Sequence, residues 1–214
     1  MERTVFLNGQ FLPTHQASIS IMDRGFLFAD GVYEVSAVID GRLVDNATHL
    51  ARLERSLAEI GIDNPYDAAT WTGFQKEIIE RNKLLEGVVY LQVTRGAAER
   101  DFAFPAGAPL TTLLFTQEKT LLNSLGGKSG VSVVTVQDQR WARRDIKSIG
   151  LLGQVLAKQA AVTRGCAEAW MVEDGLVTEG SSSTASSSHR RMRSLRGRCP
   201  AAYCRASRGC RFCA

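Results

Sequence analysis

A lysine between apolar neighbours is the first candidate for chemistry. Lys147 lies in the segment Ile146-Lys147-Ser148-Ile149, at a predicted transition from a strand to a helix. A lysine that loses solvation in such a place favours the neutral amine, and a neutral amine can attack a carbonyl to form a Schiff base. Most lysines are simply solvated. Taken alone, Lys147 therefore leaves both interpretations open.

A carboxylate followed by hydroxyl groups is the second candidate. Glu179 comes directly after a predicted strand, and the serine-rich run 180–184 follows it. A carboxylate there can pair with a protonated ring nitrogen, while the hydroxyls, including that of Ser183, face a phosphate or a substrate. A serine-rich surface loop has the same composition, so both interpretations stay open here too.

Three further side chains are of types that bind anions or substrates. Arg52 lies near the start of a predicted helix, where a guanidinium can join the terminal amides in holding phosphate. Tyr33 alternates with apolar residues and belongs either to the core or to a cleft. Arg100 lies in a predicted loop, where binding residues are often displayed. A surface position is the alternative for both arginines.

Hydrophobic periodicity supplies the elements that must position these residues. Apolar residues at helical spacing predict helices, and apolar runs beside Asn-Gly or Asp-Gly pairs predict hairpins. The predicted helices are 49–60, 70–83 and 151–164. The predicted strands are 4–7, 10–12, 32–39, 42–44, 88–95, 110–115, 131–136, 169–172 and 176–177. Asn46 or Thr48 is expected to cap the first helix, which Gly61 ends, and Gly165 is expected to end the third.

This order of strands and helices predicts a mixed α/β (α+β) fold in two domains. We expect a small N-terminal α/β domain over residues 1–118 and a Gly-containing linker over 119–130. A second, incomplete domain is expected over 131–185, which is short for an independent core. There is no 18-residue apolar window and no signal-peptide pattern, so we expect a cytoplasmic protein without a membrane segment.

The last 29 residues differ in composition from the rest of the chain. Residues 186–214 carry eight arginines, no lysine and no acidic residue. The chain has a net charge of +4, so the residues before this tail are net negative. The tail also holds four of the five cysteines, which are Cys199, Cys204, Cys210 and Cys213. It contains too little apolar surface to offset the entropy of ordering, so we expect it to be disordered.

A shifted reading frame accounts for this tail. Re-read with permitted codons in the other frame, residues 186–208 become an apolar run, a Lys-Asp turn, and a second run that ends in Leu-Pro-Gly-Ile-Thr. We therefore expect a single dropped base near the codon of Ala185, which resequencing of the gene would test. The alternative is a genuine tail that binds polyanions through its arginines or zinc through its cysteines.

The order and spacing of the candidate residues resemble the class IV fold of pyridoxal-phosphate enzymes, the group of D-amino-acid and branched-chain transaminases. The resemblance runs over residues 8–185, and the recovered Leu-Pro-Gly-Ile-Thr resembles a later phosphate-binding turn of the same family. Four segments carry it: Asp-Arg-Gly-Phe-Leu-Phe-Ala-Asp-Gly-Val-Tyr-Glu (23–34), His-Leu-Ala-Arg-Leu (49–53), Asp-Ile-Lys-Ser (145–148) and Thr-Glu-Gly-Ser-Ser-Ser (178–183). The resemblance implies that the second domain is the start of a larger, pyridoxal-phosphate-binding pseudo-barrel.

The resemblance also implies a cofactor and its ligands. Lys147 would hold pyridoxal 5′-phosphate as a Schiff base and then move the proton between the substrate Cα and the cofactor. Glu179 would pair with the pyridine nitrogen and keep it protonated. Arg52 would bind the phosphate, and Ser183 would be a further cofactor-binding residue. No metal is expected.

For the substrates, the resemblance implies an amino acid, most closely a D-amino acid, and a 2-oxo acid. Tyr33 and Arg100 would address the carboxylate, with Arg100 reaching in from the neighbouring protomer of a homodimer. D-amino-acid transaminases commonly carry a histidine two residues after this arginine, whereas this chain has Phe102, which cannot donate a hydrogen bond. A branched-chain or (R)-amine transaminase is therefore the alternative within the family.

Outside the family, the alternative is an inactive fragment with a polyanion- or zinc-binding tail. No specific nucleic-acid binding is expected. We expect little or no turnover by this chain, because it lacks the later phosphate-binding turns.

Overall fold

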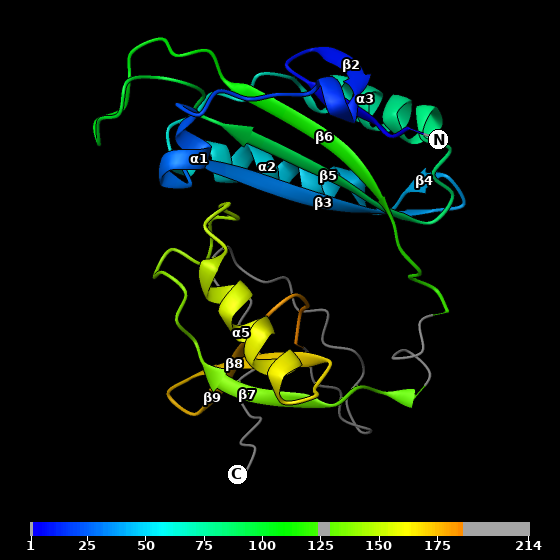
Figure 1. The fold of residues 1–214 in the computed structure, drawn as a ribbon, viewed down its shortest axis with the longest axis vertical. Coiled ribbons are helices and arrows are strands. Elements are labelled where there is room, and N and C mark those ends of the chain that lie inside the picture. Colours follow the sequence, from blue (N-terminus) through cyan, green and yellow to red (C-terminus); the bar gives the residue numbers. More distant parts are fainter. Residues whose placement is uncertain (1, 124–128, 186–214) are drawn as a thin grey trace. The chain divides into compact units, whose positions relative to one another are not determined.

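The protein forms two compact units in the computed structural model, which describes residues 2–123 and 129–185 (Figure 1). Of these residues, unit 1 takes 2–123 and 146–150, and unit 2 takes 129–145 and 151–185. The sequence placed Lys147 in a second domain that begins at residue 131. The structure differs here, because the short segment that contains Lys147 packs with unit 1.

Unit 1 is built on a six-stranded sheet in which all neighbouring strands run antiparallel. The strand order is β2-β1-β6-β5-β3-β4. The strands are β1 (Thr4–Leu7), β2 (Gln10–Pro13), β3 (Gly31–Ile39), β4 (Arg42–Leu43), β5 (Gly87–Thr94) and β6 (Thr111–Glu118). The hairpin turns that the sequence predicted at Asn8-Gly9 and Asp40-Gly41 are confirmed. All four of these residues have positive φ, as a two-residue hairpin turn requires.

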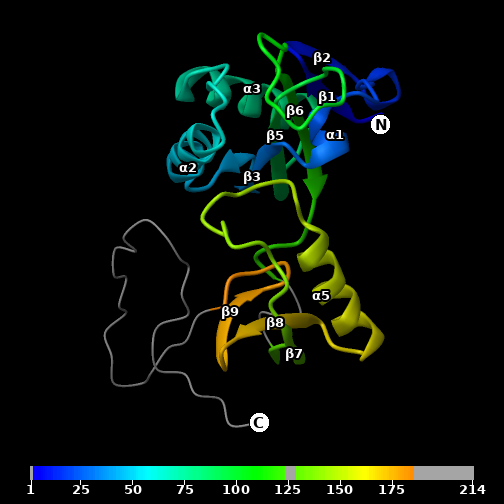
Figure 2. The same ribbon diagram turned by 90° about the vertical axis from the view of Figure 1, so that its left-hand side faces the viewer.

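Two helices cover one face of this sheet, as Figure 2 shows. They are α2 (Asn46–Glu59) and α3 (Ala68–Arg81), and both were predicted from apolar spacing. The predicted cap of α2 is wrong: Asp45 precedes the helix without a side-chain cap. The Asn46 side chain instead donates to Thr72 and Gln75 and accepts from Ser36.

Two short helical segments lack a periodic signal. They are the 3-10 turn η1 (Thr14–Gln16) and the five-residue helix α1 (Arg24–Phe28). Asp23 precedes α1, and its side chain accepts a hydrogen bond from the Gly25 amide. An aspartate N-cap was therefore the only sequence signal for α1.

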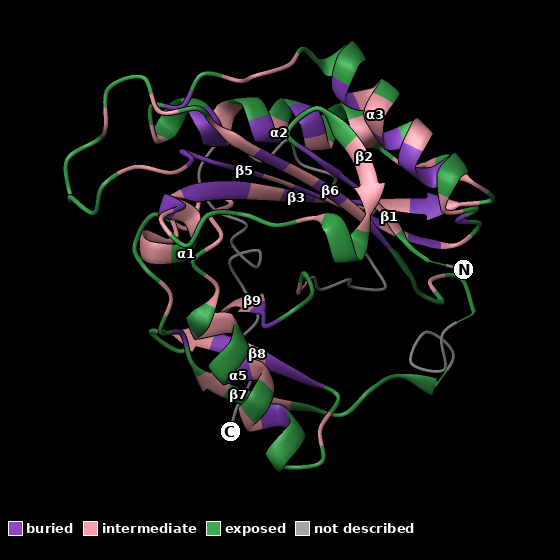
Figure 3. Ribbon diagram, turned by 45° about the horizontal axis from the view of Figure 1, so that its top comes forward, coloured by how far each residue is buried: buried purple, intermediate pink, exposed green. Residues whose placement is uncertain are grey.

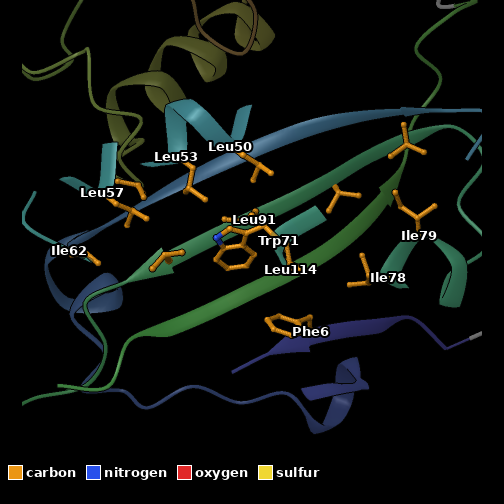
Figure 4. Close-up of a cluster of buried hydrophobic side chains, with 14 of the residues drawn as sticks. Phe6, Leu50, Leu53, Leu57, Ile62, Trp71, Ile78, Ile79, Leu91 and Leu114 are labelled. Carbon is orange, nitrogen blue, oxygen red and sulfur yellow. The ribbon is translucent and has the colours of Figure 1, made fainter. Parts of the chain in front are cut away.

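The core of unit 1 lies between the sheet and the two helices (Figure 4). Trp71 of α3, Leu53 of α2 and Leu91 of β5 are fully buried there. Burial of each such side chain contributes about 1.5–3 kcal/mol. Strand alternation places even-numbered residues of β3 on this core face, and odd-numbered residues, including Tyr33, on the opposite face.

The described part of unit 2 is a smaller α/β arrangement. Its strands are β7 (Val133–Gln137), β8 (Glu168–Glu173) and β9 (Leu176–Gly180), with β7 and β8 parallel and β8 and β9 antiparallel. The helix α5 (Leu152–Thr163) connects the parallel pair, and Gly165 follows it with positive φ, as predicted. Buried residues in this unit are few, as the colouring in Figure 3 shows.

The predicted mixed α/β class is confirmed. The pseudo-barrel implied by the resemblance goes beyond the described part of unit 2 and stays a prediction. The predictions about the tail, namely its disorder, its cysteines and its shifted reading frame, fall on residues 186–214 and lie outside the described residues.

Candidate functional site

Backbone hydrogen bonds fix the segment around Lys147 beside the start of β3. The Tyr33 amide donates to the Lys147 carbonyl oxygen at 3.0 Å, and the Ile149 amide donates to the Gly31 carbonyl oxygen at 3.1 Å. On the other side, the Lys147 amide donates to the hydroxyl of Ser56, a buried residue of α2, at 3.4 Å. The lysine therefore has a defined place in unit 1.

Gly31 is needed where this segment meets the sheet. A Cβ atom at position 31 would lie 2.6 Å from the backbone oxygen of Val93 and 3.2 Å from the Ile149 side chain. Only glycine allows this close approach without a shift of the backbone. The close approach of the backbone thus explains why the second residue of the Asp-Gly-Val-Tyr-Glu motif is a glycine.

The side-chain amine of Lys147 contacts the phenol of Tyr33. Lys147 Nζ donates to Tyr33 Oη at 3.3 Å and lies 4.4 Å from the centroid of the Tyr33 ring. Both residues are half-buried. The sequence proposed them as separate candidates, and the structure brings them into direct contact.

Tyr33 belongs to a stack of three aromatic rings. The Tyr33 and Tyr90 rings are 5.6 Å apart between centroids, and the Tyr90 and Phe115 rings are 4.7 Å apart. The rings come from β3, β5 and β6 and lie on the sheet face opposite the two helices. Neither Tyr90 nor Phe115 was predicted from the sequence to have a role.

A buried carboxylate holds Arg52. Glu34 of β3 is 1% exposed, and its two oxygens accept hydrogen bonds from Arg52 Nε at 2.6 Å and Arg52 Nη2 at 2.8 Å. His49 Nδ1 lies 3.0 Å from the same carboxylate. Burial opposes ionisation of Glu34, but the hydrogen bonds from Arg52 and His49 outweigh burial and hold its pKa below the usual value.

Glu34 was not among the predicted site residues, although a sequence signal was present. Alternation along β3 places position 34 on the same face as Val32 and Val38, which is the core face. A charged residue at a core position needs a partner. The partner is Arg52, whose guanidinium is thereby oriented although its side chain is 41% exposed.

Unit 2 carries the other two predicted site residues. Glu179 lies in β9, where its Oε1 accepts hydrogen bonds from the amides of Gly180 at 3.3 Å and Ala185 at 3.1 Å. The hydroxyl of Ser183 donates to Glu168 Oε2 at 2.9 Å. A phosphate contact of Ser183 stays a prediction, since the hydroxyl has a protein partner here.

Glu168 organises the serine-rich run after β9. Its carboxylate accepts hydrogen bonds from the hydroxyls of Ser181, Ser182 and Ser183 and from the amide of Ala169. Burial opposes its ionisation, but these donors lower the pKa of Glu168 to about 2. The run is therefore an ordered turn around a carboxylate.

Arg100 lies exposed in the loop between β5 and β6, as predicted. Its guanidinium is 5.2 Å from the ring centroid of Phe28 and 5.6 Å from that of Phe102. Phe102 is 79% exposed. The residue that departs from the D-amino-acid pattern thus lies next to the arginine predicted to bind the substrate.

The candidate residues divide between the two units. Unit 1 holds Lys147, Tyr33, Arg52 and Arg100, and unit 2 holds Glu179 and Ser183. Within the described residues, no group of three or more His, Cys, Asp or Glu side chains is arranged to hold a metal ion. The helices in this part of the chain are too short or too polar to cross a bilayer.

Comparison with protein families gives a match that contains all six of these residues. The family model described as amino-transferase class IV matches residues 31–188, well over half of the chain. The chain belongs to the class IV aminotransferases. The family resemblance noted in the sequence is thereby confirmed.

Curated relatives of this class IV aminotransferase are D-alanine aminotransferases. The protein from Staphylococcus aureus (strain MSSA476) is 40% identical over 181 residues, which are 85% of this chain and 64% of the relative. The protein from Bacillus licheniformis is 41% identical over 181 residues, which are 84% of this chain and 63% of the relative. The chain thus spans less than two thirds of the length of these relatives.

Solved structures with the same fold are branched-chain amino acid aminotransferases. The Escherichia coli enzyme has a TM-score of 0.77 at 16% identity, and the match covers 85% of this chain and 63% of that enzyme. The T.th. enzyme solved with pyridoxamine 5′-phosphate has a TM-score of 0.76 at 21% identity, with 85% and 63% coverage. The enzyme from Thermoproteus uzoniensis, solved with norvaline, has a TM-score of 0.71 at 23% identity, again with 85% and 63% coverage. At these low sequence identities, the structural similarity supports a shared fold and nothing more.

Proposed function

We propose that this class IV aminotransferase binds pyridoxal 5′-phosphate through Lys147 and transfers the amino group of a D-amino acid to a 2-oxo acid. The observation that carries the proposal is the fixed contact between the Lys147 amine and the Tyr33 phenol. About 40% identity to D-alanine aminotransferases supports the choice of a D-amino acid.

The chemical groups of the described site residues fit this cofactor. A half-buried amine is suited to an aldehyde, and a guanidinium held by a buried carboxylate is suited to a phosphate. A carboxylate with two backbone amides on one oxygen, as in Glu179, is suited to a protonated ring nitrogen. When bound, pyridoxal phosphate would supply an electron sink for the electrons released at the substrate Cα.

Each residue would have a separate task in this reaction. Lys147 Nζ would bind the cofactor aldehyde and carry the proton to and from the substrate Cα. Tyr33 Oη accepts a hydrogen bond from this amine and would orient it. Arg52, with Glu34 behind it, would hold the phosphate, and Glu179 would pair with the ring nitrogen. Ser183 is proposed as a further phosphate ligand.

We also propose a cytoplasmic homodimer in which Arg100 binds the substrate carboxylate of the neighbouring protomer, together with Tyr33. The exposure of Arg100 in its loop is compatible with this role. Sedimentation of the purified chain would test the homodimer. A dimer is expected, and a monomer at all concentrations would contradict the proposed assembly.

One observation favours a second donor class. Phe102 stands beside Arg100, and its side chain cannot donate a hydrogen bond to a carboxylate. A donor without a carboxylate, such as an (R)-amine, would tolerate this change. A branched-chain amino acid is the other alternative, and the fold agrees equally well with it.

The test is a single-turnover reaction. The purified chain is incubated with pyridoxal 5′-phosphate and then with D-alanine, L-alanine, D-leucine, L-leucine or (R)-1-phenylethylamine, and the 2-oxo acid or ketone formed is measured by chromatography. Pyruvate from D-alanine but not from L-alanine is the expected result, in an amount that does not exceed the amount of chain, because little or no repeated turnover is expected. Acetophenone alone would favour the (R)-amine, and a keto acid from L-leucine alone would favour the branched-chain alternative.

Two variants make this test specific for Lys147. Lys147→Ala should form no product, because the amine that binds the cofactor is lost. Lys76→Ala, which removes an exposed lysine of α3, should behave as wild type. Equal product from wild type and Lys147→Ala would contradict the proposed function.

A further inference from the structure

Three aromatic rings form a continuous stack on the sheet face that Lys147 contacts. Tyr33, Tyr90 and Phe115 come from the neighbouring strands β3, β5 and β6. The interplanar angles are 19° for Tyr33 and Tyr90 and 20° for Tyr90 and Phe115. Tyr90 lies directly opposite Phe115 in the strand register and diagonal to Tyr33. Rings at such positions are within contact distance on one face of a sheet.

Tyr90, the central ring, is fixed at its hydroxyl end as well. Tyr90 Oη donates to Gln92 Oε1 at 2.7 Å, and Gln92 is the residue opposite Tyr33 in the register. Burial, with a smaller effect of the Tyr33 phenol, raises the pKa of Tyr90, so its hydroxyl remains a neutral donor. The Tyr90 ring is thus held by an aromatic ring on each side, and its hydroxyl is held by a hydrogen bond.

The amine of Lys147 lies at the far end of this stack. Lys147 Nζ contacts Tyr33, the ring at one end of the stack, through the Tyr33 hydroxyl and the face of the ring. The backbone bonds of the 146–150 segment place the Cα of Lys147, but they do not orient a long, flexible side chain. The orientation of the amine therefore depends on the orientation of the Tyr33 ring.

We infer that Tyr90 is a positioning residue that holds the Tyr33 ring in place and, through that ring, the amine of Lys147. Tyr90 stacks on Tyr33, and Tyr33 is the ring that contacts the lysine. The positioning is a property of unit 1, whereas its use in catalysis rests on the proposed function. The two parts can fail separately and are tested separately.

Three substitutions separate positioning from general stability. Tyr90→Leu removes the central ring, and Tyr90→Phe restores it without the hydroxyl. Phe11→Leu is the matched control, because Phe11 also contacts an aromatic ring in unit 1 but does so edge-on, against Phe6 on the helix-covered face. Thermal unfolding of all three variants shows how much each substitution costs in stability.

The positioning is read by nuclear magnetic resonance on protein with labelled lysine. Lys147 Nζ lies over the Tyr33 ring, 4.4 Å from its centroid, so the protons of the neighbouring ε-methylene should resonate upfield of those of other lysines, and Lys147→Arg identifies the signal. We expect Tyr90→Leu to move this signal to the position of surface lysines, while Tyr90→Phe and Phe11→Leu leave it in place. An unchanged signal in Tyr90→Leu would overturn the inference, as would an equal loss in Phe11→Leu.

The catalytic use is read by borohydride trapping of pyridoxal 5′-phosphate at limiting reagent. The measured quantity is the ratio of pyridoxyl label on Lys147 to pyridoxyl label on the exposed residue Lys76. Tyr90→Leu should lower this ratio about two- to tenfold, the factor that an aromatic pair supplies, and Tyr90→Phe should lower it less than about twofold. A wild-type ratio near one, with the upfield signal present, would reject the proposed function but keep the positioning. A ratio in Tyr90→Leu equal to that of wild type would reject the use of this positioning in cofactor binding, whatever the position of the Lys147 signal.

Discussion

Unit 1 and unit 2 differ in how well their described residues are packed. In unit 1 the sheet and two helices enclose Phe6, Leu53, Trp71 and Leu114, all fully buried. The buried cluster of unit 2 is made of four smaller side chains: Ala157, Ala161, Ala169 and Met171. On the other side of α5, apolar residues are 52–70% exposed; they are Leu152, Val155, Leu156 and Val162.

This difference bears on the chemistry, because Lys147 belongs to the better packed unit. Its segment is tied to β3 and α2, although the chain reaches it from unit 2 and returns to unit 2 afterwards. We therefore expect the geometry around Lys147 to depend on the stability of unit 1, and the geometry around Glu179 to depend on that of unit 2.

The largest effect is expected in the core of unit 1. Trp71→Ala should lower the free energy of unfolding of unit 1 by about 3–5 kcal/mol, because it leaves a large cavity. Hydrogen exchange detected by mass spectrometry would show lost protection in β5 and β6. Trp141→Ala is the control, since Trp141 is 46% exposed. Comparable losses for both variants would contradict the described core.

Glu34→Gln should cost less, and its cost should depend on pH. At pH 7 we expect a loss of about 1.5–3 kcal/mol, since hydrogen bonds to a charged group are removed. The pKa of Glu34 is lowered by folding, so its ionised form stabilises unit 1 above the usual pKa of 4.5, and this contribution is lost as the pH falls. Wild type and variant should therefore converge in acid, in urea unfolding monitored by circular dichroism. Glu80→Gln on the exposed side of α3 is the control and should change the free energy of unfolding by less than about 0.5 kcal/mol at pH 7.

A substitution in unit 2 tests whether its small core is tightly packed. Ala161 of α5 is fully buried, so Ala161→Leu should destabilise unit 2 by about 1–3 kcal/mol through overpacking. Hydrogen exchange in β8 should increase while β5 is unaffected. Gln159→Leu adds the same side chain at an exposed position of α5 and should leave exchange unchanged. Equal exchange in both variants would mean that the α5 interface is loose.

The smallest effect is expected on the exposed face of α5. Val155→Gln should change the free energy of unfolding by less than about 0.5 kcal/mol, as surface substitutions usually do. The measurement is urea unfolding with exchange in β8 as the local readout. A loss above about 1 kcal/mol, twice the usual surface effect, would show that a partner covers this face in solution, and the comparison between the units would need revision.

Much of the fold followed from local sequence patterns. The Asn-Gly and Asp-Gly turns and the apolar spacing of α2 and α3 gave the elements of unit 1, because turns and amphipathic helices depend on neighbouring residues. The helix α1 was missed because five residues are too few for a periodic pattern. The cap at Asn46 was wrong because tertiary partners, Ser36 and Gln75, compete for its side chain.

The site was only partly predictable, for a different reason. Lys147, Glu179 and Arg52 carried recognisable chemistry, but the contact of Lys147 with Tyr33 joins residues 114 positions apart. The placement of Lys147 in unit 1 depends on hydrogen bonds to β3 that no local pattern reveals. Glu34 had a local signal in strand alternation, whereas Tyr90 and Phe115 look like ordinary strand residues in the sequence.

The central claim is that Lys147 is the residue to which the cofactor binds. The most direct test is to incubate the full chain with pyridoxal 5′-phosphate, reduce it with borohydride, and map the labelled peptides by mass spectrometry. At stoichiometric cofactor we predict a pyridoxyl group on Lys147 in clear excess over the label on every other lysine, and loss of this dominant label in Lys147→Ala. Labelling spread evenly over exposed lysines, with Lys147 unmodified, would contradict the claim.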